Sequence, residues 1–173
     1  MSALPEWIDL PTRKPTRHPA HDYDSACGYH VVICVKDMAL LFGKVVEGRM
    51  ELNYIGRMVA ASIQHHFFRY AGVELKTCGI MPNHLHLLVL LHDSNLSGRT
   101  IGLTHIIQRF KSYTATSYLK WRKESDAQQL PWKLWQDSFW DRVIRSEEDL
   151  LRTWEYIENN PLAWNLARKE QLG

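Results

Sequence analysis

The 173-residue sequence is poor in cysteine, and its three thiols, Cys27, Cys34 and Cys78, show no metal-binding spacing. An odd number of cysteines without a C-x-x-C pair fits neither a disulfide framework nor a zinc knuckle. The sequence also lacks an apolar run approaching the roughly 20 residues that cross a bilayer, and its first twenty residues lack the apolar core of a secretory signal. We therefore expect a cytoplasmic protein with no membrane partner.

Charge of one sign is equally scarce, because the net charge is only +2 with histidine neutral. Bulk charge therefore neither requires nor excludes a nucleic-acid partner. The basic residues are nonetheless concentrated, since residues 109–145 hold eight Lys or Arg against four Asp or Glu. Such a stretch can contact phosphates, or it can be an ordinary solvated face.

Apolar residues are plentiful, at 45% of the chain with seven Trp, which is enough to fill the core of one domain. The segment before residue 25 is different, because it is rich in Pro and charge and has no hydrophobic period. We therefore expect residues 1–24 to form an extended basic arm and residues 25–173 to form a single domain.

Hydrophobic periodicity predicts four strands and three helices, with a turn at Glu47-Gly48. The predicted strands cover 28–36, the two halves of 73–92 on either side of Pro82, and 139–144, and the predicted helices cover 54–70, 103–121 and 147–160. The strands are too closely joined for parallel crossovers. The order therefore indicates an α+β fold in which helices cover a mainly antiparallel sheet.

The last predicted helix carries the clearest boundary signals. Ser146, with Asp149 three residues further on, resembles a capping box at the start of the helix. Pro161 is expected to end the helix at Asn159 or Asn160, because proline lacks the N–H that continues the helical pattern. The apolar stripe expected to pack this helix consists of Leu150, Trp154 and Ile157.

Two histidines open the apolar run MPNHLHLLVLL at residues 81–91. Because side chains alternate along a strand, His84 and His86 point to one face while Leu85 and Leu87 point to the other. Two interpretations are open. The histidines are either adjacent ligands of one metal ion, or polar residues where a buried strand emerges toward solvent.

Tyr156 and Asn160 lie four residues apart on the last predicted helix and therefore share one face. The Asn160 carbonyl oxygen is a legitimate metal ligand, and the Tyr156 phenol becomes a nucleophile where a cation or a base lowers the cost of losing its proton. Together with His84 and His86 they would form a minimal site for phosphoryl transfer. Alternatively, Tyr156 packs with a hydrogen-bonded hydroxyl and Asn160 only ends the helix.

Two segments in this order, MPNHLHLLV and LWQDSFWDRVIRSEEDLLRTWEYIENNPLAW, resemble the single-tyrosine HUH (IS200-like) transposases, and specifically their branch of REP-associated tyrosine transposases. Residues 156–161 match the Tyr-Ile-x-x-Asn-Pro pattern of that family. The upstream segment RKPTRHPAHDYDSACGYHVVIC is similar to the basic arm that leads into the family's first strand, and FKS fits its middle helix. The resemblance spans nearly the whole chain.

This resemblance implies a ferredoxin-like antiparallel sheet with helices on one face, the HUH endonuclease fold. It implies that His84, His86 and Asn160 bind a divalent metal, Mg or Mn, and that Tyr156 is catalytic. The implied reaction is attack on a DNA phosphodiester, which forms a 5′-phosphotyrosine link and releases a 3′-hydroxyl that can later attack the link. The implied partner is single-stranded DNA folded into a palindromic, REP-like hairpin, bound by a monomer or a homodimer.

Basic residues of the arm and of the stretch between the two motifs are predicted to contact DNA phosphates. They are Arg13, Lys14, Arg17, Arg109, Lys111, Arg142 and Arg145. Two other functions stay open: a non-catalytic protein that binds DNA hairpins, and a metal phosphodiesterase that uses water. Tyr113 and Tyr118 are rival nucleophiles, although neither has an Asn or an acidic residue four positions on.

Overall fold

The computed structural model describes residues 27–92 and 101–170, and its helices and strands follow the predicted order. The sheet strands are β1 (Cys27–Cys34), β4 (Val73–Met81), β5 (His84–Leu91) and β6 (Trp140–Ile144). The helices are α1 (Tyr54–Phe67), α2 (Leu103–Glu124) and α3 (Glu147–Glu170), with a short 3-10 turn at Lys36–Met38. None of the helices in the described part is long and apolar enough to cross a membrane. The predicted arm, residues 1–24, lies outside the described residues.

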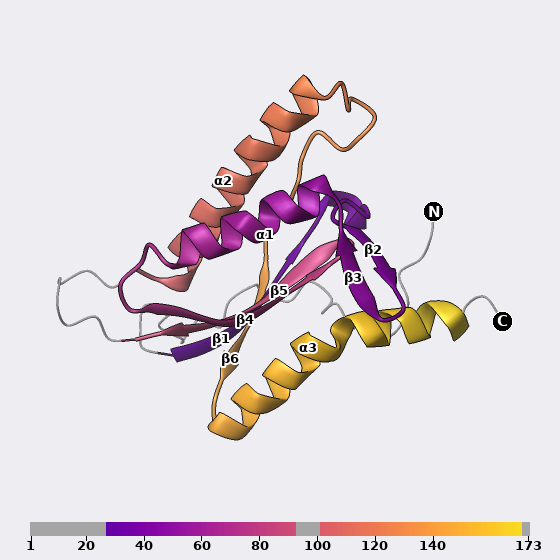
Figure 1. Cartoon of the computed structure of the whole chain (residues 1–173). Helices are drawn as coiled ribbons and strands as arrows, with labels where there is room; N and C mark the ends of the chain where they lie inside the picture. The colour runs from indigo at the N-terminus through magenta and orange to yellow at the C-terminus, as the bar shows by residue number, and fades with distance from the viewer. Residues whose placement is uncertain (1–26, 93–100, 171–173) are drawn as a thin grey trace.

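The four strands form one antiparallel sheet in the order β4-β5-β1-β6. Helix α1 follows β1 and leads to β4, and α2 follows β5 and leads to β6, so each helix joins two strands separated by one other strand. This is the ferredoxin-like arrangement, and it confirms the predicted α+β fold. Figure 1 shows α1 and α2 together on one side of the sheet.

A small hairpin of β2 (Gly43–Val46) and β3 (Arg49–Leu52) is inserted between β1 and α1. Its two turn residues are Glu47 and Gly48, which both have positive φ, at 50° and 74°. Two consecutive positive φ values match the right-handed twist of a two-residue hairpin, so the predicted turn is confirmed. The hairpin reaches α3, because a Cβ at Gly48 would lie 3.0 Å from Leu162 Cδ1.

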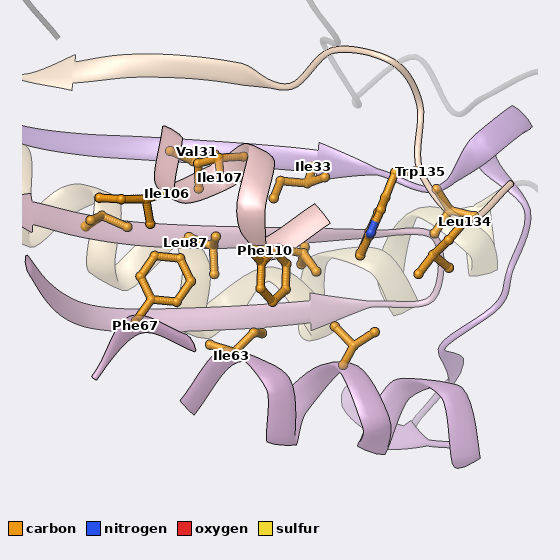
Figure 2. Packing of buried hydrophobic residues seen from close by; sticks show 14 of the residues in the cluster. Val31, Ile33, Ile63, Phe67, Leu87, Ile106, Ile107, Phe110, Leu134 and Trp135 are labelled. Atoms are coloured by element: carbon orange, nitrogen blue, oxygen red, sulfur yellow. The ribbon is translucent and has the colours of Figure 1, made fainter. Parts of the chain in front are cut away.

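The core lies between the sheet and the helix pair α1 and α2. Alternate residues of β5, Leu85, Leu87 and Val89, are fully buried on this side, where they meet buried residues of both helices such as Ile63 and Phe110. Figure 2 shows this layer of aliphatic and aromatic side chains. The same alternation directs His84 and His86 to the opposite side of the sheet.

Helix α3 covers that opposite side, so the expectation of helices on one face was wrong (Figure 1). Among the side chains of α3 that the structure describes, up to residue 164, four are buried against the sheet: Thr153, Ile157, Asn160 and Trp164. The predicted stripe was therefore correct only at Ile157, since Trp154 is 39% exposed and Leu150 is half-buried. The inner face of α3 is half polar, since Thr153 and Asn160 alternate with Ile157 and Trp164 where the helix lies over the histidines.

The predicted helix stop at Pro161 was also wrong, because α3 continues to Glu170 with Pro161 inside it. Proline removes the N–H that would bond to the Ile157 carbonyl, which costs about 3 kcal/mol in a helix interior. Contacts beyond the proline offset this cost: Leu162 packs against the β2–β3 turn, and Trp164 is buried near His84. Figure 1 shows the helix changing direction near its middle.

Candidate active site

Two neighbouring strands place three histidines on the face of the sheet that α3 covers. His84 and His86 lie on β5, and His30 lies on β1, where Val32 is the residue paired with His86. Each of the three histidines is at most 6% exposed. The histidines are therefore not polar residues that emerge into solvent, which removes one of the two interpretations left open by the sequence.

The side chains of His84, His86 and Asn160 converge on one point. His86 Nε2 lies 3.1 Å from His84 Nε2 and 3.0 Å from the amide nitrogen of Asn160. Two ligands at right angles around one octahedral ion, each about 2.1 Å from it, lie about 3 Å apart. The two spacings would also suit neighbouring ligands of one ion if the Asn160 amide turned to present its oxygen.

The donor set is small and uncharged. Among the described residues, no three His, Cys, Asp or Glu side chains are grouped so that they could hold a metal ion. A metal site here would therefore take its third side-chain ligand from the Asn160 amide oxygen. Imidazole suits Zn, Cu, Fe and Ni, whereas Mg and Mn prefer oxygen ligands, so a Mg or Mn ion here would take water and phosphate oxygens as its remaining ligands.

Hydrogen bonds orient both imidazoles. His84 Nδ1 lies 2.7 Å from the Asn83 side-chain oxygen, which can only accept, so His84 carries its proton on Nδ1. His86 Nε2 accepts from the Asn160 amide nitrogen. With these assignments, made from the network, the lone pairs of His84 Nε2 and His86 Nε2 face each other at 3.1 Å. A cation near both nitrogens would accept both lone pairs, so that the repulsion between them would be replaced by two attractive nitrogen–cation contacts.

Burial keeps these rings neutral. It lowers the pKa of His84 to about 4, and it holds the pKa of His86 well below its usual value, with His84 and His30 adding to the effect. Burial, followed by the charge of Arg142, also lowers the pKa of His30 to about 4. A neutral imidazole keeps the lone pair that a metal ion requires.

His30 is a site residue that the sequence reasoning missed. Its Nε2 lies 3.0 Å from His86 Nδ1, and the two rings stack with centroids 5.2 Å apart. Trp140 and Tyr156 meet the His30 ring edge-on at 5.4 and 6.0 Å. The only signal in the sequence was one polar residue inside the apolar strand GYHVVIC, and that signal does not identify its partner.

Tyr156 lies beside the histidines and remains accessible. Its ring meets His86 edge-on with centroids 5.5 Å apart, and the residue is 54% exposed. Within the described part of the chain its hydroxyl has no hydrogen-bond partner. Tyr118 is different, because it is fully buried, donates to the Pro131 carbonyl at 2.6 Å and has its pKa raised by burial. The structure therefore brings Tyr156, and not Tyr118, to the histidines.

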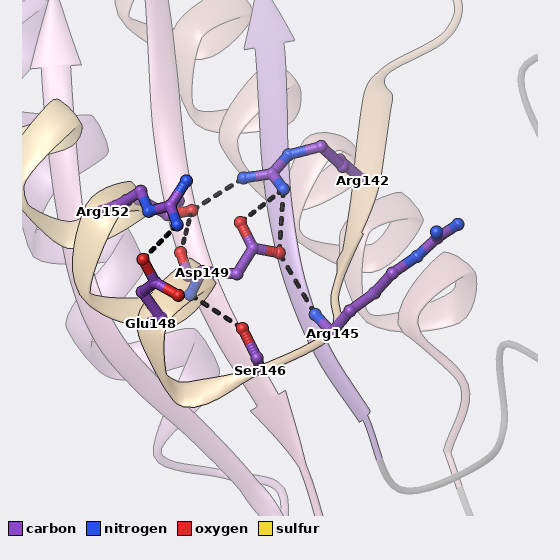
Figure 3. A network of polar contacts seen from close by, with 7 residues as sticks. Arg142, Arg145, Ser146, Glu148, Asp149 and Arg152 are labelled. Carbon is purple, nitrogen blue, oxygen red and sulfur yellow. Dashed lines mark hydrogen bonds and ion pairs between the residues drawn. The ribbon is translucent and has the colours of Figure 1, made fainter.

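A polar network fixes the start of α3 to β6. Arg142 donates to both carboxylate oxygens of Asp149, at 2.7 and 2.9 Å, and to the Thr153 hydroxyl at 2.8 Å (Figure 3). Asp149 also accepts from the Arg145 backbone N–H, and its own N–H donates to the Ser146 hydroxyl, which confirms the predicted cap. The network sets the direction of the helix that carries Tyr156 and Asn160.

Gly79 allows α3 to approach the sheet beside the site. It pairs with His86 across the β4–β5 ladder. A Cβ at this position would lie 3.0 Å from Ile157 Cγ2 and 3.4 Å from the Ile157 carbonyl oxygen. A Cβ here would require a shift of a few tenths of an ångström, and a larger side chain would displace the helix turn between Tyr156 and Asn160.

The basic residues predicted to contact DNA are not gathered at this site. Lys111 donates to the backbone carbonyls of Gln136, Asp137 and Ser138 at 2.8 to 3.1 Å, and Arg142 forms an ion pair with Asp149.

The other predicted DNA contacts are exposed or lie outside the described residues. Arg109 is exposed on α2, on the other side of the sheet. Arg145 is exposed, and its side chain points away from the network in Figure 3. Arg13, Lys14 and Arg17 lie outside the described residues.

Comparison with known proteins gives the following similarities. The family model described as "Transposase IS200 like" matches residues 23–160. An uncharacterized protein of Haemophilus influenzae is 30% identical over 170 residues, covering 88% of this chain and 89% of its own. The solved structure of a REP-associated tyrosine transposase bound to a REP hairpin superposes with a TM-score of 0.60 at 16% identity, covering 85% of this chain and 73% of the other.

Proposed function

The chain belongs to the IS200-like transposase family, and from that premise we propose that it is a metal-dependent enzyme that nicks and rejoins single-stranded DNA through Tyr156. The observation that carries the proposal is the placement of an accessible phenol against His86, where His84, His86 and the Asn160 amide converge. A water-using phosphodiesterase would not need a tyrosine at this position.

In the proposed reaction the Tyr156 oxygen attacks a DNA phosphorus atom. The phenol gives up its proton, an O–P bond forms, and the P–O3′ bond breaks. The 3′-oxygen takes up a proton and leaves as a free hydroxyl, while the 5′-phosphate stays on the tyrosine. Because the new link is also a phosphodiester, a 3′-hydroxyl can attack it in the reverse sense and rejoin DNA without an external energy source.

The residues around Tyr156 have three proposed roles: metal binding, orientation of the tyrosine ring and positioning of the helix. A divalent ion held by His84, His86 and Asn160 would polarise a phosphoryl oxygen and offset the charge that develops on it. His86 also packs edge-on against the Tyr156 ring and so limits its rotation. The Arg142–Asp149 network and Gly79 fix the helix that brings the phenol and the amide to the histidines.

We propose a palindromic hairpin of the REP kind as the substrate. A REP-associated tyrosine transposase with a similar fold has been solved bound to such a hairpin, which supports the proposal at the level of architecture. Of the predicted phosphate contacts we retain Arg145, whose side chain is exposed next to the start of α3, and the cations of the arm, Arg13, Lys14 and Arg17. Arg109 is exposed but lies on the opposite side of the sheet from Tyr156. Phosphate contacts of this kind position the DNA and do not read its sequence.

The test is capture of the covalent intermediate. The protein is incubated with single-stranded hairpin DNA from the flanks of its own gene, with Mn²⁺ or Mg²⁺ or with excess chelator, and adducts are resolved on a denaturing gel. We expect an adduct with the wild type only when metal is present. Tyr156→Phe should form none and should still bind the hairpin, because only one hydroxyl is lost.

Tyr113→Phe is the matched control, because Tyr113 is similarly exposed, at 50% against 54% for Tyr156, and lies on α2. This variant should form the adduct as the wild type does. An adduct on Tyr156→Phe would assign the nucleophile to another residue. Wild-type cleavage that persists in chelator would remove the metal from the proposal.

A further inference from the structure

We propose that His30 is a positioning residue that fixes the tautomer and the ring orientation of His86, so that His86 directs its Nε2 lone pair toward a metal ion. The inference rests on the proposed metal site of His84, His86 and Asn160. It begins with the hydrogen bond between His30 Nε2 and His86 Nδ1, 3.0 Å long and buried.

The orientation of the Asn160 amide assigns the protons of the network, and it leaves the Nε2 atoms of His84 and His86 facing each other as two acceptors. His86 Nε2 accepts from the Asn160 amide nitrogen, so the single proton of the neutral His86 ring is on Nδ1. That proton points at His30 Nε2, which must therefore be an acceptor. His30 in turn carries its own proton on Nδ1. The bond thus runs from His86 to His30 and leaves the metal-facing nitrogen of His86 unprotonated.

Each of the two proposed histidine ligands has its own hydrogen-bond acceptor for Nδ1. The Asn83 side-chain oxygen accepts from Nδ1 of His84 at 2.7 Å, just as His30 accepts from Nδ1 of His86. The Asn83 amide nitrogen faces the Met38 carbonyl at 3.4 Å, which orients its oxygen toward His84. Partners of this kind fix which ring nitrogen of a ligand is free and increase its basicity.

The His30 ring is itself held rigidly enough for this role. It is 6% exposed, stacks on His86 at an interplanar angle of 26°, and has Trp140 and Tyr156 edge-on at its sides. Its strand also pairs directly with both β5 and β6. An acceptor in this position cannot rotate away without displacing three aromatic rings.

The first experiment reads the tautomer in the metal-free wild type at neutral pH. The ¹⁵N chemical shifts of the histidine ring nitrogens distinguish a protonated from an unprotonated nitrogen. We expect His86 to be protonated on Nδ1, with a scalar coupling across the hydrogen bond to His30 Nε2. A proton on His86 Nε2 would overturn the proposal, and this reading needs no variant and no bound metal.

The second experiment compares His30→Leu, which removes the acceptor, with His30→Gln, which keeps an amide oxygen. His30→Leu should spread the His86 proton over both nitrogens and raise the Mn²⁺ dissociation constant about 10- to 100-fold in a calorimetric titration. His30→Gln should restore most of both properties. His66→Leu is the control, because His66 is also 6% exposed and bonds to the Ile106 carbonyl in the α1–α2 layer.

The possible results separate the two proposals. Equal Mn²⁺ affinity and an unchanged His86 tautomer in His30→Leu would overturn the role of His30 while leaving the metal site intact. A wild type that binds no Mn²⁺ would overturn the proposed metal site, whereas the tautomer measurement would still decide the role of His30. A loss of affinity in His66→Leu equal to that in His30→Leu would indicate a general effect of losing a buried histidine, and would also count against the proposal.

Discussion

The three side chains that converge at the site differ in what each can be replaced by. His84 and His86 each offer an imidazole lone pair, and both are nearly fully buried. Asn160 offers a neutral amide oxygen, which a water molecule can replace at a small cost. All three side chains converge on the same point, but losing an imidazole should reduce metal affinity more than losing the amide.

This inequality predicts different responses to truncation. His86→Ala should reduce Mn²⁺ affinity and adduct formation together by more than 100-fold, because it removes a proposed ligand and the ring against which Tyr156 packs. Asn160→Ala should lower both by about 10-fold, since water can occupy the vacated ligand position. Calorimetric titration and single-turnover cleavage measure the two effects. An Asn160→Ala variant as defective as His86→Ala would give the amide a further role.

At the residue scale the sequence predicted what lies close along the chain. His84 and His86 share a face through the period of one strand, and Tyr156 and Asn160 through one turn of a helix. His30 could not be found in this way, because its contact with His86 depends on the register between β1 and β5, which only the folded sheet defines. Lys111 was recognised as basic, but its three carbonyl partners depend on the path of residues 136–138.

At the scale of elements, the placement of α3 decides whether the site forms. The sequence predicted where this helix begins, because the Ser146 cap is local. It did not predict where the helix ends, because the contacts of Leu162 and Trp164 that carry α3 past Pro161 are made with distant segments. The sequence also did not predict which side of the sheet α3 covers, since a helix whose inner face mixes polar and apolar side chains gives a weak amphipathic signal.

Gly79 should limit how closely α3 packs on β4. In Gly79→Ala the new Cβ meets Ile157 at 3.0 Å and requires only a small shift, whereas Gly79→Val should push the helix away. We expect the valine variant to lose about 1–3 kcal/mol of unfolding free energy and most of its adduct formation, with a smaller loss for alanine. Denaturant unfolding and the adduct assay measure these losses. A valine variant with wild-type stability and activity would show that α3 does not depend on this close approach.

The Arg142–Asp149 pair should contribute a pH-dependent part of stability. The hydrogen bond from Arg142 lowers the pKa of Asp149, so the stabilisation is full above the ordinary pKa of an aspartate and is lost as pH falls through the lowered one. Because the pair is partly exposed, Arg142→Met should lose only about 1 kcal/mol at neutral pH. The difference from wild type should shrink in acid.

Denaturant unfolding at neutral and acidic pH measures this difference. Arg145→Met is the control, because the Arg145 side chain points away from the network and only its backbone N–H takes part (Figure 3). It should change stability by less than about 0.5 kcal/mol. A difference between Arg142→Met and wild type that grows in acid would contradict the assigned ion pair.

At the scale of the whole molecule, the described residues of one chain bring the proposed nucleophile and the three proposed metal ligands together. Tyr156 packs against His86 of its own chain, and α3 lies along its own sheet. We therefore expect the tyrosine to act in its own subunit. A mixture of Tyr156→Phe and His86→Ala proteins should form no adduct, although the mixture holds an intact tyrosine and an intact metal site.

The control for this mixture is the same total concentration with half wild-type protein, which should give half of the wild-type adduct. Restored adduct formation in the mixture, carried by the His86→Ala chain, would show that the tyrosine crosses to a second subunit. In that case α3 would have to exchange its contacts with β4 between subunits, and the Gly79 variants would affect dimers and not monomers.

The alternation along β5 has a consequence for how the gene can change. Leu85, Leu87 and Val89 build the core on one side of the sheet, while His84 and His86 build the site on the other. Loss or gain of a single codon just ahead of His84 that shifts the whole strand by one residue would exchange the two sets, so that imidazoles enter the core and leucines enter the site. A protein with this change would lose the packing of its core and the histidines of its site together. Point substitution is thus the only gradual route by which this strand can diverge.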